Sequence, residues 1–360
     1  MLTNAIAPSD FMTTTPATSF QDRLDGVKAF FTNETFLYII KRLLQGLLTL
    51  FLVSALSFSI IQLAPGNYLD NLRQDPQISP ERLEELNQQY GFDKSPIEQY
   101  GIWLTNVVTQ GDFGQSFEYS RPVTELIAER IPNTLLLAVS SIILSWMLAI
   151  PLGIIGAVKQ NQPIDRFLRV ISYIGQGFPS LITTLLLLFL AQNLSPLLPV
   201  GGMTSINHAT LSPVGKVLDI AWHMILPTLA LTISGFAGLQ RLMRGELLDV
   251  LRQDYIQTAR SKGLSENKVV YVHALRNAIN PFITILGFEF ASLLSGSFIA
   301  EIFFNWPGLG RLIFQAVTLR DLYLVMGSLI MGASLLIVGN LLADLMLKFT
   351  DPRIKLEKLK

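Results

Sequence analysis

Residues 249–281 read DVLRQDYIQTARSKGLSENKVVYVHALRNAINP and form a long polar interruption in an otherwise apolar C-terminal half. Apolar and aromatic positions recur at helical spacing in and just before its first half. These positions are Leu248, Leu251, Tyr255 and Ala259. Two cations and then Gly263 follow, an order typical of a helix C-terminus. The stretch therefore predicts a first helix that ends at Gly263.

A second helix is predicted directly after this glycine. Ser265 suits the N-cap position, Glu266 lies in the positively polarised first turn, and Leu264 and Val269 occupy the two positions of a hydrophobic staple. Seven Lys and Arg residues lie between positions 241 and 276. We expect an exposed basic segment, helix–glycine–helix, on the cytoplasmic face. The alternative is a basic amphipathic loop that only fixes the membrane topology.

The composition identifies a membrane protein with several spans. Hydrophobic residues make up 50% of the chain and charged residues 15%, and the mean hydropathy is +0.43, whereas a soluble domain carries roughly 25% charge. The chain has no cysteine, which excludes disulfides and thiolate metal sites.

Six segments are long enough to cross the roughly 30 Å hydrocarbon core, which takes about 20 residues. They cover residues 43–64, 133–158, 167–193, 220–240, 281–304 and 322–343. If the N-terminus is cytoplasmic, 19 of the 27 Lys and Arg residues lie inside and 8 outside. Because positive charge marks the cytoplasmic side, both termini and the basic segment are predicted to be cytoplasmic.

The chain divides into five predicted parts. They are a cytoplasmic N-terminal extension (1–35), a first transmembrane helix (36–64), a small extracytoplasmic subdomain (65–132), a core of five further spans (133–350, including the loop 245–281) and a cytoplasmic tail (351–360). Apolar residues on one helical face of the extension are compatible with a short helix on the membrane surface, and disorder is the alternative. These residues are Phe20, Leu24, Val27 and Phe31.

The motif YIQTARSKGL…HALRNAINP resembles the cytoplasmic loop of ABC importer permeases, in the form found in their dipeptide/oligopeptide/nickel branch. Ala259, Gly263 and Leu275 match the general family pattern. Gln257 and Arg276 stand where that pattern has Glu and Pro, and the peptide branch shares both departures. In the family this loop carries the coupling helix that docks into a groove on the ATPase subunit. The positions expected to couple to the ATPase are Tyr255, Thr258, Ala259, Arg260, Lys262, Gly263, Leu264, His273, Leu275 and Arg276.

The resemblance implies an all-α type I importer permease with six transmembrane helices in the cytoplasmic (inner) membrane. It also implies a second, homologous permease, two ATPase subunits that bind ATP and Mg²⁺, and an extracytoplasmic substrate-binding protein. No cofactor on this chain and no nucleic-acid partner are expected. The resemblance continues from GDFGQSF, at residues 111–117, to the tail motif TDPRI.

The segment NWPGLGRLIFQAVTLRDL, which follows Glu301, resembles the same branch. Pro307 and Gly308 permit a tight turn, so residues 311–318 are predicted to form a short helix at the outer membrane surface. Glu301, Pro307 and Gly308 join Glu289 as candidates for the translocation pathway or a contact between subunits. Glu289 is the only carboxylate deep within a predicted span, where ionisable groups default to functional candidates. A structural hydrogen bond or ion pair is the alternative for Glu289.

Motifs for catalysis by this chain are absent from the sequence. It contains no G-x-x-x-x-G-K-[ST], H-E-x-x-H or G-x-S-x-G, so energy must come from a partner. His208, His223 and His273 fall in different segments without metal-ligand spacing, which predicts no metal site. His223 could line a pathway, and a simple hydrogen-bonded histidine is the alternative. Prolines inside spans predict kinked helices that line a cavity. These are Pro151, Pro179 and Pro227.

Several functions remain open at this stage. A di- or oligopeptide is the expected substrate, and nickel chelates, glutathione or another small solute are the alternatives within the branch. A secondary transporter would need buried ion-coupling groups and often shows repeated halves, which the sequence does not show. An intramembrane enzyme would need a nucleophile motif.

Overall fold

The computed structural model describes residues 34–63, 66, 68–73, 78–89, 91–194 and 197–350. The predicted surface helix of the N-terminal extension and the cytoplasmic tail lie outside the described residues. So do some side chains within helices, including that of Glu289.

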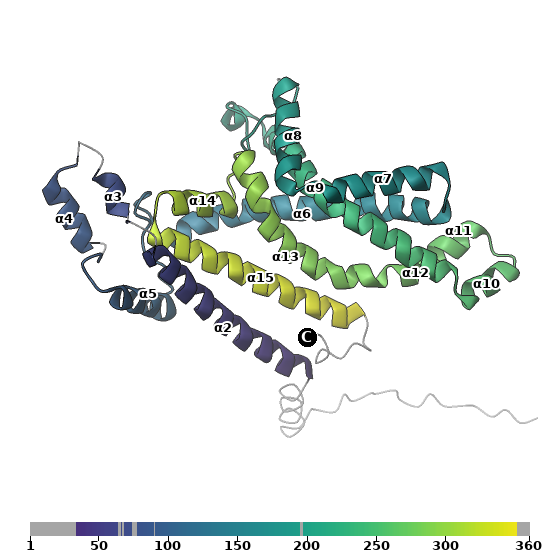
Figure 1. The fold of residues 1–360 in the computed structure, drawn as a ribbon, viewed down its shortest axis with the longest axis horizontal. Helices are drawn as coiled ribbons and strands as arrows, with labels where there is room; N and C mark the ends of the chain where they lie inside the picture. Colours follow the sequence, from purple (N-terminus) through teal and green to yellow (C-terminus); the bar gives the residue numbers. More distant parts are fainter. Residues whose placement is uncertain are drawn as a thin grey trace, which may run out of the picture.

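The described residues form helices and no strand, which confirms the all-α prediction (Figure 1). The long helices are α2 (Glu34–Leu63), α6 (Val123–Val158), α9 (Pro213–Leu251), α13 (Asn280–Phe303) and α15 (Leu322–Thr350). The shorter ones are α3 (Tyr68–Leu72), α4 (Pro80–Gln89), α5 (Pro96–Gln110), α7 (Pro163–Gly177), α8 (Ser180–Asn193), η1 (His208–Thr210), α10 (Asp254–Ser261), α11 (Glu266–Lys268), the π-helix η2 (Val269–Ala274), α12 (Leu275–Ala278) and α14 (Leu309–Thr318).

Among the described residues, α2, α6, α9 and α15 are each long and apolar enough to cross a membrane. The predicted third span, residues 167–193, is wrong as a single helix, because α7 and α8 meet at an angle of 102°. Phe178 is extended there (φ −89°, ψ 123°), as expected for a residue before a proline, which is disfavoured in the helical region. Taken together the pair would count as a fifth span. The fifth predicted segment, residues 281–304, corresponds to α13, whose 24 residues reach about 36 Å at ~1.5 Å per residue.

Two spans extend well beyond their predicted bounds. α6 begins at Val123 rather than after Pro132, so its first turns belong to the bundle and not to the subdomain. Val123, Leu126 and Ile127 are buried there against α14 and α15. α9 runs through Pro227 for 39 residues. Of the three prolines predicted to kink spans, Pro151 and Pro227 lie inside continuous helices, and only Pro179 marks a break.

The long helices pack side by side, α7 and α8 lie against α9, and most other short helices lie at two ends (Figure 1). α6 packs along α9, α13 lies against α15 and α6, and α2 lies along α15. The segment α10–α12 occupies one end, here called the α10 end, while α14 and α3–α5 lie at the opposite end, here called the α14 end. α14 confirms the predicted short helix and begins two residues earlier than expected.

A buried carboxylate fixes the subdomain to the α14 end. Asp321 accepts hydrogen bonds from Ser116 Oγ (2.5 Å) and from the backbone N–H of Glu118 (3.1 Å). It also caps α15 by accepting from the N–H of Leu324 (3.2 Å). Burial raises the pKa of Asp321, while these hydrogen bonds oppose the shift. The contacts hold the loop after α5 against the corner between α14 and α15.

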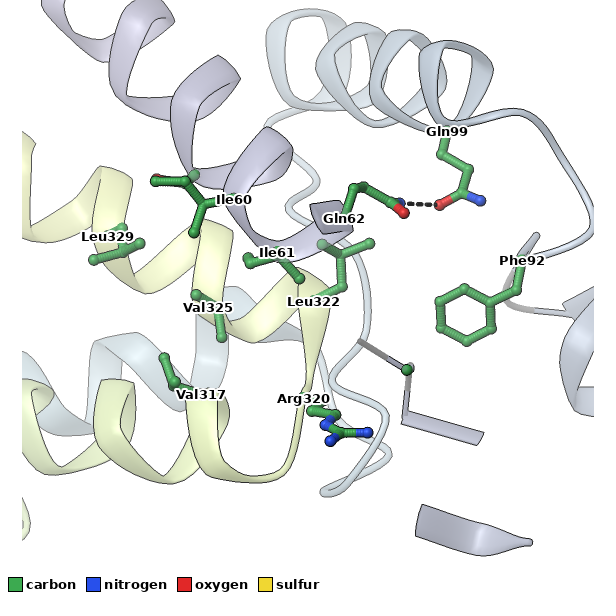
Figure 2. A pocket seen from close by; sticks show the side chains of 12 residues that line it. Ile60, Ile61, Gln62, Phe92, Gln99, Val317, Arg320, Leu322, Val325 and Leu329 are labelled. Carbon is green, nitrogen blue, oxygen red and sulfur yellow. Dashed lines mark hydrogen bonds between the residues drawn. The ribbon is translucent and has the colours of Figure 1, made fainter. Parts of the chain in front are cut away.

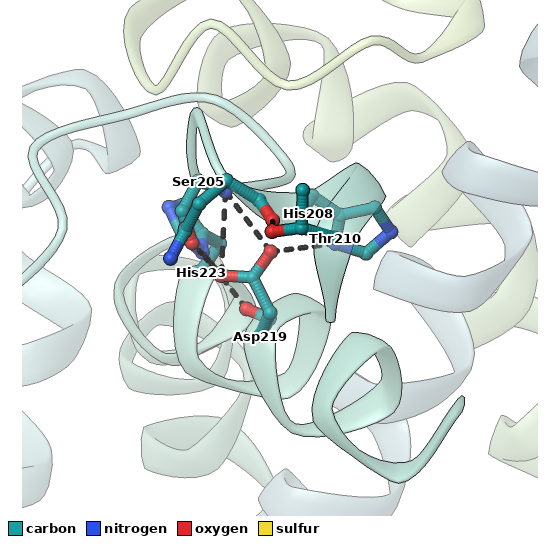
Figure 3. A network of polar contacts seen from close by, with 6 residues as sticks. Ser205, His208, Thr210, Asp219 and His223 are labelled. Atoms are coloured by element: carbon teal, nitrogen blue, oxygen red, sulfur yellow. Dashed lines mark hydrogen bonds and ion pairs between the residues drawn. The ribbon is translucent and has the colours of Figure 1, made fainter. Parts of the chain in front are cut away.

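A second carboxylate holds the connection between α8 and α9 (Figure 3). Asp219 accepts from the backbone N–H of Ser205 (3.0 Å) and lies 2.6 Å from His208 Nδ1. His223 Nδ1 lies 2.8 Å from the backbone oxygen of Asp219. Two histidines predicted to lie in unrelated segments therefore meet around one aspartate, and His223 is hydrogen-bonded, as the alternative held. The described residues contain no group of three or more His, Cys, Asp or Glu that could hold a metal ion.

Candidate functional site

The predicted glycine elbow closes α10. Gly263 has φ +78°, in the left-handed region. Its N–H bonds to the carbonyl of Arg260 (2.9 Å), and the N–H of Leu264 bonds to the carbonyl of Ala259 (3.4 Å). These two bonds form a Schellman motif, in which the left-handed residue satisfies the last carbonyls of a helix. A Cβ on Gly263 would meet nothing within 4 Å, so backbone conformation alone selects glycine here.

The first predicted helix is wrong in one respect, because it consists of two helices. α9 ends at Leu251 and α10 begins at Asp254. Gln253 between them is extended (φ −72°, ψ 147°). Leu248 and Leu251 pack from the end of α9, while Ile256 and Ala259 are buried from α10 against the same apolar cluster. The break lets α10 change direction and still bury its apolar side.

The second predicted helix begins where expected but is not regular. The backbone of Ser265 is extended and α11 starts at Glu266, although the Ser265 side chain makes no capping hydrogen bond. Leu264 and Val269 join one apolar cluster, as a hydrophobic staple requires. The chain then passes through the π-helix η2 into α12. π-Helical turns inside helices are uncommon and occur often at functional sites.

The segment α10–α12 packs on an apolar core to which three long helices contribute. Ile256 and Val269 are fully buried in a cluster with Leu247 of α9, Ile154 of α6 and Phe282 of α13. The cluster also takes in Val270, Ala274 and Ala278. α10 packs directly on α9 and η2, and the shared cluster connects it to the ends of α6 and α13.

The outer face of the segment is polar and basic, but it carries fewer cations than predicted. Five of the seven cations are exposed, namely Arg252, Arg260, Lys262, Lys268 and Arg276. The other two lie on α9 and turn inward, which the charge count could not reveal. Arg241 lies over the ring of Tyr173, 5.3 Å from its centroid. Arg244 donates to the buried Asp165 of α7 from Nε (2.6 Å) and Nη2 (3.0 Å).

Two contacts stiffen the exposed face. Arg260 binds Glu266 through Nη2 (2.6 Å) and Nε (3.1 Å), which ties α10 to α11 across the glycine. The Arg260 hydrogen bonds lower the pKa of Glu266, so this carboxylate is ionised at neutral pH. Asn277 Nδ2 donates to Tyr255 Oη (2.7 Å), which ties α12 to α10.

The ten residues predicted to couple to an ATPase divide by exposure. Tyr255, Thr258, Arg260, Lys262, Gly263 and Arg276 are exposed. Ala259 is buried, and Leu264, His273 and Leu275 are partly buried. These four side chains therefore lie on the inner side of the segment and not on its exposed face. The exposed Gln257, Tyr271 and Val272 were not predicted. The helical phase of α10 could have identified Gln257, while the π-helix hides the phase of the other two.

The predicted tight turn at Pro307 and Gly308 lies against the other site candidate, Glu301. Glu301 is fully buried and accepts from Thr134 Oγ1 (2.8 Å), the N–H of Gly310 (2.7 Å) and the N–H of Arg311 (3.2 Å). The N–H of Leu309 in turn donates to Thr134 Oγ1 (2.8 Å). The carboxylate thus joins α6, α13 and the start of α14.

Neighbouring residues complete this corner. Trp306 Nε1 donates to the backbone oxygen of Asn133 (3.0 Å), and Asn133 Nδ2 donates to that of Pro307 (2.8 Å). A Cβ on Gly308 would collide with the Glu301 carboxylate, which explains the glycine. The Glu301 carboxylate is thus enclosed by donors of its own chain, and the pathway or intersubunit role of Glu301, Pro307 and Gly308 stays a prediction. Glu289 lies on α13 with its side chain outside the described residues, so its role stays a prediction.

Comparison with known proteins settles the family. Residues 149–356 match the family described as binding-protein-dependent transport system inner membrane component. Residues 35–138 match the N-terminal region of such membrane components. The chain belongs to this family. It is an ABC importer permease and a multi-pass membrane protein, as the resemblance of its loop implied.

Relatives of this permease match over nearly their full length. The oligopeptide transport system permease protein AppB of Bacillus subtilis is 41% identical over 320 residues, which cover 88% of this chain and 99% of AppB. The dipeptide transport system permease protein DppB of Lactococcus lactis is 36% identical, with 89% and 99% covered. The glutathione transport system permease protein GsiC of Escherichia coli K12 is 36% identical, with 88% and 98% covered. The chain is therefore a permease of the peptide branch.

Proposed function

We propose that this permease translocates di- or oligopeptides across the cytoplasmic membrane as one of two similar transmembrane subunits of an ATP-driven importer. The segment α10–α12 carries the proposal, because a short helix with an exposed polar face stands on a core shared by α6, α9 and α13. The names of the relatives support a peptide substrate.

The proposed partners are a second permease, two ATPase subunits that bind ATP and Mg²⁺, and a substrate-binding protein outside. This chain supplies no phosphate-binding motif, so it is not proposed to be an enzyme. Its contribution is mechanical. Closure of the ATPase pair moves α10, and the buried Ile256 and Ala259 pass that movement to α9 and α13. The spans then alternate between inward-open and outward-open arrangements.

Orientation follows from the charge bias. With both termini inside, the α10 end faces the cytoplasm, where an ATPase is available, and α3–α5 face outward. Cysteine labelling tests this, since the chain has no cysteine of its own. An impermeant maleimide should label Gln88→Cys on α4 in intact spheroplasts and should label Ser265→Cys only after lysis. The reverse pattern would overturn the orientation.

The substrate is tested in proteoliposomes that contain the complete importer. Labelled dipeptides and oligopeptides should enter only with ATP and the binding protein, and excess unlabelled peptide should compete. Glutathione import is the second candidate, because one relative is named for it. Uptake of glutathione that peptides do not inhibit would replace the peptide proposal. Uptake driven by an ion gradient without ATPase subunits would overturn the importer proposal itself.

A further inference from the structure

A cavity of ≈350 Å³ lies at the α14 end, between α2, α5 and α15 (Figure 2). Ile60 and Ile61 of α2 and Val325 and Leu329 of α15 supply apolar walls. Gln62 Nε2 donates to Gln99 Oε1 (3.0 Å) at the side toward α5. The site is therefore apolar inside with polar groups at one end.

This cavity adjoins a face of α2 that no other helix of the described residues covers. Ile60, which lines it, is 66% exposed, and Leu56 and Leu63 are 61% and 84% exposed. A row of exposed leucine and isoleucine on a spanning helix faces lipid rather than water. A molecule in the cavity would thus reach it from the membrane.

Arg320 stands at the polar end in an unusual backbone conformation. It closes α14 with the bonds of a Schellman motif, from its own N–H to Val317 (3.1 Å) and from Asp321 to Ala316 (2.9 Å). Its φ of +58° lies in the region that glycine normally supplies. A non-glycine residue held there costs free energy, and such residues cluster at ligand-binding sites. Arg320 is therefore a candidate for contact with a ligand.

Among the described side chains, the charges around Arg320 favour one anion. Its guanidinium lies against Gly66, where a Cβ would collide with it, and the Asp70 carboxylate lies beside the same glycine. Asp70 is paired with Arg73 (2.6 Å). Two guanidinium groups and one carboxylate leave one positive charge among these three side chains, which a phosphodiester would balance.

We propose that this cavity binds an anionic phospholipid, with an acyl chain between α2 and α15 and the phosphate at Arg320. Its assignment to the outer leaflet rests on the proposed orientation, while the binding itself does not. The lipid joins α2 to the corner where Leu322 and Met326 pack against Trp103 and Phe117 of the subdomain. It thereby stabilises the attachment of α3–α5 to the spans.

Native mass spectrometry of the purified complete importer tests this binding. The probe is 1-palmitoyl-2-oleoyl-phosphatidylglycerol, compared with the phosphatidylcholine that has the same acyl chains. Wild type should bind phosphatidylglycerol at least tenfold more tightly than phosphatidylcholine, because both offer the same phosphate and only phosphatidylcholine adds a choline cation, which the positive charge of Arg320 repels. Arg320→Gly should abolish that preference, and Ile60→Trp should weaken both lipids by filling the cavity. Arg82→Gln, an exposed arginine on α4, is the matched control and should bind as wild type does.

Folding is controlled in the same samples. Glycine suits the left-handed position, so Arg320→Gly should keep or raise the Tm in lipid-free detergent while losing the rise in Tm that phosphatidylglycerol gives wild type. Unchanged phosphatidylglycerol affinity in Arg320→Gly, or equal affinity of wild type for the two lipids, would overturn the proposal. Displacement of the lipid by a transported peptide would instead assign the cavity to substrate. None of these results depends on transport activity.

Discussion

The corner at the α14 end and the segment α10–α12 at the opposite end are fixed in opposite ways. At the α14 end, Glu301 and Asp321 are fully buried and each accepts three hydrogen bonds from different parts of the chain. In the segment α10–α12, the corresponding carboxylate is Glu266, whose side chain is 54% exposed and pairs with Arg260. Order in this segment comes instead from buried apolar residues and one left-handed glycine. The buried Asp165, which accepts from Arg244, lies outside this segment and joins α7 to α9.

This difference shows what each end can do. Buried acceptors that satisfy backbone N–H groups tolerate little movement, because each broken bond leaves a buried donor without a partner. A segment that is held by buried apolar residues can pass a displacement to the helices beneath it. Its exposed polar face stays accessible to a second protein. The α14 end is thus suited to hold helices in register, and the α10 end to receive force.

The largest effect is expected from Glu301→Ala. It would leave Thr134 Oγ1 and the N–H groups of Gly310 and Arg311 without their acceptor. Since each orphaned buried donor costs about 1 to 3 kcal/mol, we expect a loss of roughly 3 to 5 kcal/mol and little assembled permease. Thermal unfolding followed by size-exclusion chromatography measures it. Glu125→Ala, an exposed carboxylate on α6, is the control. A normal Tm for Glu301→Ala would remove the contrast between the ends.

Asp321→Ala should have a smaller and more local effect. It would release the subdomain loop at Ser116 and Glu118, and the spans would keep their packing. We expect a loss of roughly 2 to 4 kcal/mol and faster proteolysis between residues 68 and 110. Asp93→Ala, in an exposed turn, should change neither quantity. If proteolysis were equally fast in both variants, Asp321 would not attach the subdomain.

Gly263→Val should be milder still for stability but severe for coupling. A β-branched residue in the left-handed region costs roughly 1 to 2 kcal/mol, and the open space around Gly263 adds no clash. The permease should assemble, while peptide uptake per ATP hydrolysed falls several-fold. Gly263→Asn should lose less, because asparagine tolerates this conformation. Gly245→Val, at a helical glycine of α9 with equally open space, is the control. Fully coupled uptake by Gly263→Val would leave the segment as a topological anchor only.

The smallest effect is expected from breaking the exposed ion pair. Arg260→Gln or Glu266→Gln should lower stability by no more than about 1 kcal/mol, because exposed ion pairs contribute about 0 to 1 kcal/mol. Arg260→Gln should still weaken ATPase association, since Arg260 lies on the exposed face, whereas Glu266→Gln should weaken it less. Equal losses of association in both variants would mean that the pair, and not the Arg260 contact, matters.

Local signals in the sequence predicted much of the α10 end. Gly263 and Ser265 are positions where backbone chemistry decides the conformation, so both boundaries were found. The break at Gln253 was missed, because Leu248, Leu251, Tyr255 and Ala259 keep helical spacing across it. The spacing shows which residues are apolar, but it does not show that the helix axis changes direction between Leu251 and Asp254.

Long-range partners could not be predicted. Glu301 was found as a residue of interest, but its enclosure depends on Thr134, which lies 167 positions away. Asp165 was missed because an Asp–Arg pair in a polar connection resembles a solvated turn, and only the approach of Arg244 reveals its burial. The kink predicted at Pro179 was found, but the sequence did not show that the span breaks there into two helices at 102°.

The central claim is that the exposed face of α10 receives the ATPase subunit. A photoreactive benzoylphenylalanine at Gln257, which is exposed on α10, tests it directly in membranes that contain the whole importer, with the same residue at Gln88 of α4 as the matched probe. The account predicts an ultraviolet-dependent adduct with the ATPase subunit from position 257 and none from position 88. An ATPase adduct from position 88, or none from position 257 in a complex that hydrolyses ATP and imports substrate, would contradict it.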